Sequence, residues 1–394
     1  MAGDRIRVLV VDDSAVIRRA LSRFVESDPR LELVGTASNG LRALEMIADL
    51  HPDVVTLDIE MPSMDGLSTL ARIRFDIKPP KPAVLMCSSL THEGSHEALK
   101  ALRLGAADVI AKQSSRQHAS GADQKRFEAE YLGKILTIAR HRSQRAAMTT
   151  EVQPTRRPSA ASSTGKAPPG ETTPSETTTE PPQRTAPTVA KMVGRPKLVV
   201  IGSSTGGPPA IERALIAIPR IFPAPIVIAQ HMPAMFTRSL SERLAQACEI
   251  EVRHAGETID RLKPGAAYLV EGGMQGHVGR ARGGGLRLEI NQEPADARYA
   301  PSVDVLFESA ASLGPDVLGI VLTGMGDDGL AGAKQMNAKG AKILTQSAES
   351  CVVYGMPRAI DQAELSLASL DPDSLGLALA LTCRDIAERG RDVA

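Results

Sequence analysis

Three apolar segments in the second half of the chain each end in a sharp turn that carries a reactive side chain. The turns contain Ser203 and Ser204, then His231, then Asp327 and Asp328. Serine, histidine and aspartate together make a nucleophilic hydrolase, in which the imidazole removes the hydroxyl proton and the carboxylate orients the imidazole. Because parallel sheets in α/β folds place their sites at the carboxyl ends of strands, these turns are expected to meet.

The pattern alone leaves several alternatives open. A glycine-rich turn after a strand is also typical of a phosphate cradle, and this one lacks the GxSxG pattern of α/β-hydrolases. The spacing does not choose between the two adjacent serines or between the two adjacent aspartates. His254 and His277 lie in less regular segments and are weaker candidates for the base than His231. Backbone amides of the glycine-rich turns are candidates for an oxyanion hole.

A second set of polar side chains follows the apolar segments of the first half. Asp12 and Asp13 end the first predicted strand, and Asp58 ends the third. Three hard oxygen donors at one sheet edge suit Mg²⁺, which binds beside phosphate groups. Ser88 and Lys112 end the fourth and fifth strands and add a hydroxyl and a cation. A single acid at a strand end is commonly only a helix cap, but five such positions in order favour a carboxylate that accepts a phosphoryl group.

Composition limits the classes of protein to which this chain can belong. The 394 residues favour two domains, and 46 basic side chains balance 46 acidic ones, so no global field attracts nucleic acid. Aromatic residues make up 3% of the chain, which argues against a base-stacking platform. The four dispersed cysteines are typical of reduced thiols. With no signal peptide and no apolar run of about 20 residues, we expect a cytoplasmic protein without direct membrane insertion and without a nucleic-acid partner.

Hydrophobic periodicity predicts α/β folds on both sides of a break in composition. Five strand–helix units predict a doubly wound, flavodoxin-like parallel sheet in residues 5–122, with its last helix extending as far as residue 142. Residues 143–194 are rich in Pro, Thr, Ser and Ala, which predicts a disordered linker. Residues 195–390 predict a second α/β domain with a mostly parallel sheet. An antiparallel β-hairpin extension is expected from three of its segments: Glu251–Arg253, Ala267–Val270 and His277–Ile290.

Residues 5–115 resemble the receiver domain of two-component response regulators. The resemblance rests on Val10-Val11-Asp12-Asp13-Ser14, Leu57-Asp58-Ile59-Glu60-Met61-Pro62, Met64-Asp65-Gly66, Ser88 and Lys112. It implies that Asp58 is the phospho-acceptor and that Asp12 and Asp13, with Asp58, hold Mg²⁺. It also implies that Ser88 and Lys112 contact the phosphoryl group.

Residues 197–390 resemble the catalytic domain of the bacterial chemotaxis protein-glutamate methylesterases, which are also protein-glutamine deamidases. The matching strings are Ile201-Gly202-Ser203-Ser204-Thr205-Gly206-Gly207, Gln230-His231-Met232-Pro233 with Phe236-Thr237, Pro301-Ser302-Val303-Asp304-Val305-Leu306-Phe307, Leu322-Thr323-Gly324-Met325-Gly326-Asp327-Asp328-Gly329 and Cys351-Val352-Val353-Tyr354-Gly355-Met356-Pro357. The resemblance implies that Ser204 is the nucleophile, His231 the base and Asp328 the triad acid. It further implies that the backbone amide of Met325 lies near the oxyanion and that this domain needs no cofactor.

Three positions depart from the patterns of these families. Val109 stands where receivers carry an aromatic switch residue, and Gln113 stands where a proline usually follows the lysine. Ala300 stands where the esterases commonly have arginine before Pro-Ser-Val-Asp. None of the three removes a residue that carries the predicted chemistry.

The two resemblances together imply a regulated enzyme. Its substrates would be γ-methyl glutamate esters on chemoreceptors, and a chemotaxis histidine kinase would donate the phosphoryl group to Asp58. The unphosphorylated receiver would pack over the catalytic edge. The alternative is a phosphorylation-dependent adaptor whose second domain binds a partner without catalysis. A transcription factor is less consistent with the sequence, because no basic recognition helix follows the receiver.

Overall fold

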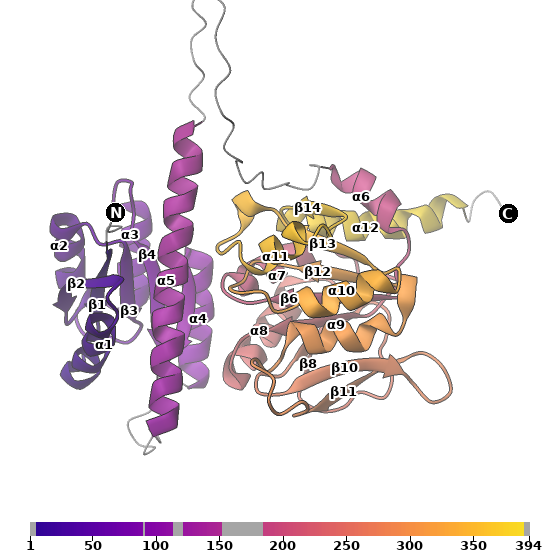
Figure 1. The fold of residues 1–394 in the computed structure, drawn as a ribbon, viewed down its shortest axis with the longest axis horizontal. Helices are drawn as coiled ribbons and strands as arrows, with labels where there is room; N and C mark the ends of the chain where they lie inside the picture. Colours follow the sequence, from indigo (N-terminus) through magenta and orange to yellow (C-terminus); the bar gives the residue numbers. More distant parts are fainter. Residues whose placement is uncertain (1–4, 90, 113–120, 152–183, 390–394) are drawn as a thin grey trace, which may run out of the picture.

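Two α/β units lie side by side in the computed structural model, which describes residues 5–89, 91–112, 121–151 and 184–389 (Figure 1). The first unit ends with the long helix α5, and the second begins with α6. Within the described residues, no helix combines the length and apolar character that a membrane crossing requires.

The first unit is built on a parallel sheet of five strands in the order β2-β1-β3-β4-β5. Its strands are β1 (Ile6–Val11), β2 (Leu31–Ala37), β3 (Val54–Asp58), β4 (Ala83–Ser88) and β5 (Asp108–Ala111). Its helices are α1 (Ala15–Ser27), α2 (Gly40–Leu50), α3 (Gly66–Phe75), α4 (His92–Leu104) and α5 (Gly121–Glu151). The predicted doubly wound sheet is therefore confirmed, and its strand order reverses between β1 and β3, where α/β folds form their sites.

Polar side chains begin the helices that follow the site-bearing strands. The Ser14 hydroxyl accepts a hydrogen bond from the Ile17 amide at the start of α1, and the Asp65 carboxylate accepts one from the Ser68 amide at the start of α3. Such caps satisfy amides that would otherwise lack partners. Each cap ends its loop at a fixed residue, so the acids at the ends of β1 and β3 are held in place.

The second unit contains a parallel sheet of seven strands in the order β14-β13-β12-β6-β7-β9-β8. Its strands are β6 (Leu198–Ser203), β7 (Ile226–Gln230), β8 (Glu251–Ala255), β9 (Ala266–Val270), β12 (Val317–Val321), β13 (Lys342–Gln346) and β14 (Ala368–Leu370). Its helices are α6 (Ala186–Val193), α7 (Gly207–Ile216), α8 (Ala234–Ala247), α9 (Val303–Ala311), α10 (Leu330–Ala338), α11 (Met356–Gln362) and α12 (Pro372–Arg389), with 3₁₀ turns at Gly314–Asp316 and Ala348–Ser350. The β6 side chains alternate between two cores. Leu198 and Val200 belong to the one with Phe307 of α9, while Val199 and Ile201 belong to the one with Ile211 of α7.

The predicted β-hairpin is smaller than the segments assigned to it. Strands β10 (Gln275–Arg280) and β11 (Leu286–Asn291) pair antiparallel as a separate two-stranded sheet. In contrast, β8 and β9 pair in parallel with each other, and β9 pairs in parallel with β7. The expectation that Glu251–Arg253 and Ala267–Val270 belong to the hairpin extension is therefore wrong, because both segments extend the main sheet.

The predicted linker is too long at both ends. Helix α5 continues to Glu151, and α6 lies within residues that composition assigns to disorder. One face of α6 is apolar, and Val189 is fully buried in the same core as α7 and α12. This burial offsets the cost of ordering the segment. The central part of the predicted linker, residues 152–183, lies outside the described residues.

The two units meet where α4 packs against α7 and α8. Leu99 and Leu102 of α4 lie beside Pro208 and Leu240, which come from α7 and α8. The Glu212 carboxylate of α7 is 2.9 Å from the Arg243 guanidinium and 3.8 Å from that of Arg103 in α4. The junction therefore combines apolar contact with charge pairing.

Candidate active site and candidate metal centre

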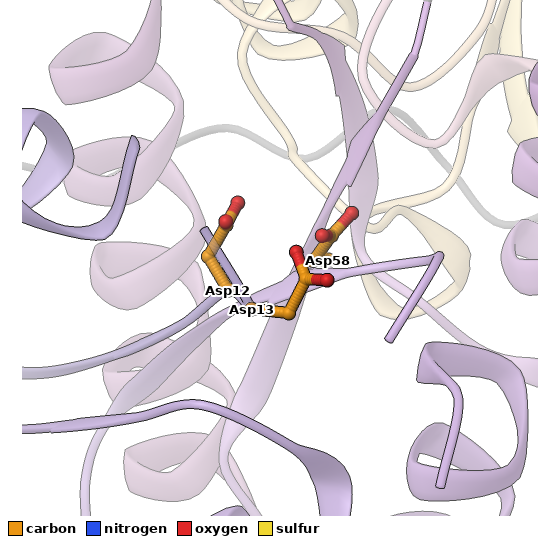
Figure 2. Close-up of side chains that lie close together, drawn as sticks. All are labelled: Asp12, Asp13 and Asp58. Carbon is orange, nitrogen blue, oxygen red and sulfur yellow. The ribbon is translucent and has the colours of Figure 1, made fainter. Parts of the chain in front are cut away.

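Three carboxylates gather at the end of the sheet of the first unit. Asp12 and Asp13 directly follow β1, and Asp58 ends the neighbouring β3. One oxygen from each lies within 4.8 Å of the others, and Figure 2 shows the side chains of Asp13 and Asp58 beside each other. The Lys112 ammonium is 2.7 Å from an Asp12 oxygen and 2.6 Å from an Asp58 oxygen. The topology thus brings together four of the residues predicted for this site.

Burial gives this cluster unusual electrostatics. Burial raises the pKa of Asp58 to about 6, against the opposing effect of the Lys112 ammonium. Burial lowers the pKa of Lys112, but the nearby carboxylates of Asp58 and Asp12 outweigh it and the net shift is upward. The cluster of three carboxylates therefore contains one ammonium, which pairs with Asp12 and Asp58. A hard divalent cation can balance the excess of negative charge. The three acids fit the donor set that such an ion requires.

Ser88 lies at the same sheet edge, at the end of β4. Asp58 pairs with Cys87, the residue before Ser88, in the β3–β4 register. The buried Ser88 hydroxyl donates to the Gly94 carbonyl at 2.8 Å. Val109 lies in the adjacent strand β5, whereas Gln113 lies outside the described residues.

His231 and Asp328 form a buried pair in the second unit. His231 follows β7 and Asp328 precedes α10, and the distance from Nε2 of His231 to Oδ2 of Asp328 is 2.7 Å. The Asp328 carboxylate also accepts from the Ser302 hydroxyl and the amides of Val303 and Asp304, at 2.7–3.0 Å. Burial raises the pKa of Asp328, but the hydrogen bond from His231 and those from the amides prevail, so the pKa lies below its usual value. The carboxylate is therefore anionic at neutral pH.

The second ring nitrogen of His231 has a different environment. Within the described chain, the Nδ1 atom is buried and has no hydrogen-bond partner. The imidazole stacks on the Tyr299 ring with centroids 4.1 Å apart and planes at 15°. The ring is thus held through one nitrogen and one face, while the other nitrogen can accept a proton.

The two candidate serines have different surroundings. Ser203 is fully buried, and its hydroxyl donates to the Gln230 side-chain oxygen at 2.7 Å. Ser204 lines a cavity together with His231. Its backbone is fixed on both sides, because its amide donates to the Thr323 carbonyl at 3.0 Å and its carbonyl accepts from Gln230 Nε2 at 2.9 Å. The geometry therefore favours Ser204 as the reactive serine.

The turn after β12 passes directly against Ser204. A Cβ atom on Gly324 would lie 2.9 Å from the Ser204 Cβ, so this contact requires glycine. Met325 follows and lines the same cavity as Ser204 and His231. Asp327 is exposed, while Asp328 beyond it is buried at the histidine.

The cavity of about 650 Å³ lies between the two units. Side chains of the first unit supply one wall, and those of the second supply the other. The lining residues from the first unit are Asp108, Val109, Ala111, Arg126, Ala129, Glu130 and Lys134. His254 and His277 are not among the described residues that line it, and they bond instead to Thr237 at 3.3 Å and to Asn291 at 3.2 Å.

Two contacts join the first unit to residues beside Ser204. The Thr205 hydroxyl donates to an Asp108 carboxylate oxygen at 2.6 Å, and the Lys134 ammonium of α5 pairs with the same carboxylate. Also in α5, the Thr137 hydroxyl lies 2.8 Å from the Met325 sulfur. The first unit therefore covers the candidate active site and contacts it on two sides.

Several residues at the site were not predicted from the sequence. Gln230 and Tyr299 contact the candidate serine and histidine, and Asp108 contacts the neighbour of the serine. Gln230 carries a usable signal, because it directly precedes His231 at the end of an apolar strand. Tyr299 and Asp108 carry none, since their contacts arise only when distant segments come together.

Comparison with known proteins assigns a family to each unit. Residues 199–379 match the CheB methylesterase family, and residues 8–120 match the response regulator receiver domain. Over 392 residues, the chain is 44% identical to protein-glutamate methylesterase/protein-glutamine glutaminase 1 of Oleidesulfovibrio alaskensis, covering 95% of this chain and 98% of that protein. It is 43% identical over 401 residues to the corresponding protein 2 of Nitratidesulfovibrio vulgaris, with coverage of 95% and 98%.

Two solved structures match parts of this chain. The CheB methylesterase catalytic domain of Thermotoga maritima matches with 33% identity and a TM-score of 0.45, covering 47% of this chain and 98% of that one. The response regulator domain of Thermotoga maritima CheB matches with 41% identity and a TM-score of 0.31, covering 35% and 98%.

Proposed function

Because this chain belongs to the CheB methylesterase family and carries a response regulator receiver domain, we propose that it hydrolyses glutamate γ-methyl esters on chemoreceptors and deamidates receptor glutamines in the cytoplasm. The observation that carries the proposal is that His231, which pairs with Asp328, lines one cavity together with Ser204. Phosphorylation of Asp58 is proposed to activate the reaction.

The proposed reaction proceeds through an acyl-enzyme. Ser204 Oγ attacks the ester carbonyl carbon while Nδ1 of His231, the ring nitrogen without a partner, takes the hydroxyl proton. Asp328 stabilises the imidazolium through Nε2. The imidazolium then protonates the departing methoxide, and methanol leaves.

Water completes the cycle by the same proton transfers. His231 takes a proton from the attacking water, the acyl–oxygen bond to Ser204 breaks, and the serine recovers its proton. The receptor regains a glutamate carboxylate. With a glutamine substrate the first leaving group is ammonia, and the remaining steps are unchanged. The Met325 amide is the proposed donor to the carbonyl oxygen as it becomes negative.

The position of the cavity supports control by the receiver. Its walls come from both units, and Asp108 and Lys134 of the first unit line it together with Ser204 and His231. A receptor helix is about 10 Å wide and has to present its side chain from the side that the first unit covers. We therefore infer that the receiver must move away before a receptor helix reaches Ser204.

Phosphorylation at the acidic cluster is the proposed signal that makes the receiver move away. Asp58 would accept a phosphoryl group from a chemotaxis histidine kinase, and Asp12 and Asp13 would hold Mg²⁺ with it. When bound, the ion would neutralise negative charge on the phosphoryl group. Lys112 already pairs with Asp58 and would pair with the phosphoryl group, and Ser88 would turn its hydroxyl from Gly94 to the same group.

The test measures methanol released from methylated receptor membranes. Wild type should release methanol, faster with a small-molecule phosphodonor and Mg²⁺, while Ser204→Ala should release none. Asp58→Asn should keep the basal rate and ignore the phosphodonor. A wild type without activity would favour an adaptor, and activity in Ser204→Ala would displace Ser204 as nucleophile. An equal response of Asp58→Asn to the phosphodonor would refute activation through Asp58.

A further inference from the structure

We propose that Asp304, in the first turn of α9, is a positioning residue of the active site. Its carboxylate accepts hydrogen bonds from the backbone that follows Asp328. These bonds fix the orientation of the Asp328 carboxylate toward the His231 ring. This inference rests on the proposed function in one respect, because its kinetic effect is measured in the proposed hydrolysis. The geometry that carries it is independent of the substrate.

Reciprocal hydrogen bonds join the N-terminal ends of α9 and α10, because the amides at each end bind a carboxylate from the other. Asp328, just before α10, accepts hydrogen bonds from the α9 start, including the amides of Val303 at 2.7 Å and Asp304 at 3.0 Å. Asp304 in turn accepts the amides of Gly329 at 2.9 Å and Gly332 at 2.8 Å, both on its Oδ1 atom. Each helix start thus binds the acid of the other, and the two acids cannot shift independently.

Close packing of α9 and α10 accompanies these reciprocal hydrogen bonds. Gly329 has a left-handed conformation with φ of +100°, and a Cβ atom there would lie 2.8 Å from a Val303 methyl carbon. A Cβ atom on Gly332 would lie 2.5 Å from the Phe307 Cβ. The α10 backbone therefore lies directly against α9. Packing sets how closely the two helices approach, and the hydrogen bonds that Asp304 accepts fix the rotation of the turn that carries Asp328.

The two acids have opposite electrostatics. Burial raises the pKa of Asp304 to about 6, with a smaller contribution from the charge of Asp328 and against the amide hydrogen bonds of Gly332 and Gly329, while the pKa of Asp328 is lowered. Asp328 is therefore the anion that faces His231. The role of Asp304 needs an acceptor oxygen at one place but no charge, because a single neutral oxygen can accept both amide protons.

Substitutions can separate position from charge. Asp304→Asn keeps an acceptor oxygen in place and removes the charge, whereas Asp304→Glu keeps the charge and moves the oxygens by one methylene. Asp304→Ala removes both. Glu308→Ala, an exposed acid one turn later on the same helix, is the matched control.

The experiment measures kcat and KM for methanol release in the full-length protein with phosphodonor, together with the melting temperature of each variant. It also records the one-dimensional NMR signal of the imidazole N–H proton between His231 and Asp328, which needs no substrate. We expect Asp304→Asn and Glu308→Ala to stay near wild type in kcat. We expect Asp304→Ala and Asp304→Glu to lose about tenfold in kcat with KM little changed, the scale of one misplaced hydrogen bond. Their imidazole proton signal should shift or broaden.

Two results would overturn the proposal. One is a folded Asp304→Glu or Asp304→Ala variant with wild-type kcat and an unchanged imidazole signal. The other is an Asp304→Asn variant impaired as much as Asp304→Glu, which would mean that charge matters rather than position. If wild type releases no methanol, the proposed function fails, and the imidazole signal across the same variants still decides the role of Asp304.

Discussion

Removing the Asp108 carboxylate should release the catalytic unit from the receiver without phosphorylation. Asp108 is buried in β5 and accepts the Thr205 hydroxyl at 2.6 Å, one residue from the proposed nucleophile. The same carboxylate pairs with Lys134, which also lines the cavity. In Asp108→Ala the docked arrangement leaves the Thr205 hydroxyl without this acceptor and the Lys134 ammonium without this partner. Separation of the two units exposes both groups to water, so the free-energy cost of leaving them without these partners disappears.

The size of the effect follows from the type of bond that is lost. A hydrogen bond to a charged group contributes about 1.5–3 kcal/mol. Since about 1.4 kcal/mol is a factor of ten, the equilibrium between docked and open receiver should shift by about 10- to 100-fold. When the open fraction of unphosphorylated wild type is small, the basal rate of Asp108→Ala rises by the same factor. The basal rate of Asp108→Ala is not expected to exceed the rate of phosphorylated wild type.

The assay compares basal and phosphodonor-stimulated methanol release in wild type and Asp108→Ala. The matched control is Asp76→Ala, which removes an exposed receiver acid that pairs with Arg72 at 2.8 Å, away from the interface. A double-mutant cycle with Thr205→Ala isolates the bond, because each change should add little in the presence of the other. An unchanged basal rate in a folded Asp108→Ala variant would refute the proposed role of the Asp108–Thr205 hydrogen bond, and so would fully additive effects in the cycle.

Two further predictions concern the residues around His231. Tyr299→Ala should lower kcat by about two- to tenfold, since ring stacking contributes about 0.5–1.5 kcal/mol, whereas Tyr299→Phe should stay near wild type; equal losses in both would mean that the hydroxyl matters instead. Because the folded pKa of Asp328 lies below its usual 3.8, its stabilising contribution is complete above that value and is lost as pH falls through the folded pKa. The difference in urea midpoint between wild type and Asp328→Asn should therefore be larger at pH 5 than at pH 3, and a difference independent of pH would contradict the lowered pKa.

The sequence predicts what lies at strand ends more successfully than what lies between distant surfaces. Asp12, Asp13 and Asp58 meet because parallel strands end at one edge, and this follows from the apolar pattern before them. The same logic places His231 near Asp328. Segment α6 was assigned to the linker, because the composition of its neighbours hides an apolar face only eight residues long.

Contacts between segments that are distant in the sequence leave no local pattern. In the sequence Asp304 appears only as part of a matching string, since its partners are the backbone amides of Gly329 and Gly332, which any residue except proline can supply. Asp108 fits an ordinary strand, and its contact with Thr205 exists only when the two units are together. Positions of this kind can be predicted only after the relative placement of the elements is known.

The position of Asp108 also suggests how phosphorylation reaches the interface. Strand β5 begins at Asp108, which contacts Thr205, and Lys112, which contacts Asp58, directly follows its last residue. A phosphoryl group on Asp58 would draw the Lys112 ammonium into a new ion pair and pull on the end of this short strand. Because β5 consists of only four residues, Asp108–Ala111, a displacement at Lys112 would act close to Asp108. On this reasoning Asp108→Ala should raise the basal rate and also shrink the response to the phosphodonor. Asp58→Asn in the Asp108→Ala background should leave the raised basal rate unchanged and remove the response that is left. A phosphodonor response of wild-type size in Asp108→Ala would place the coupling elsewhere.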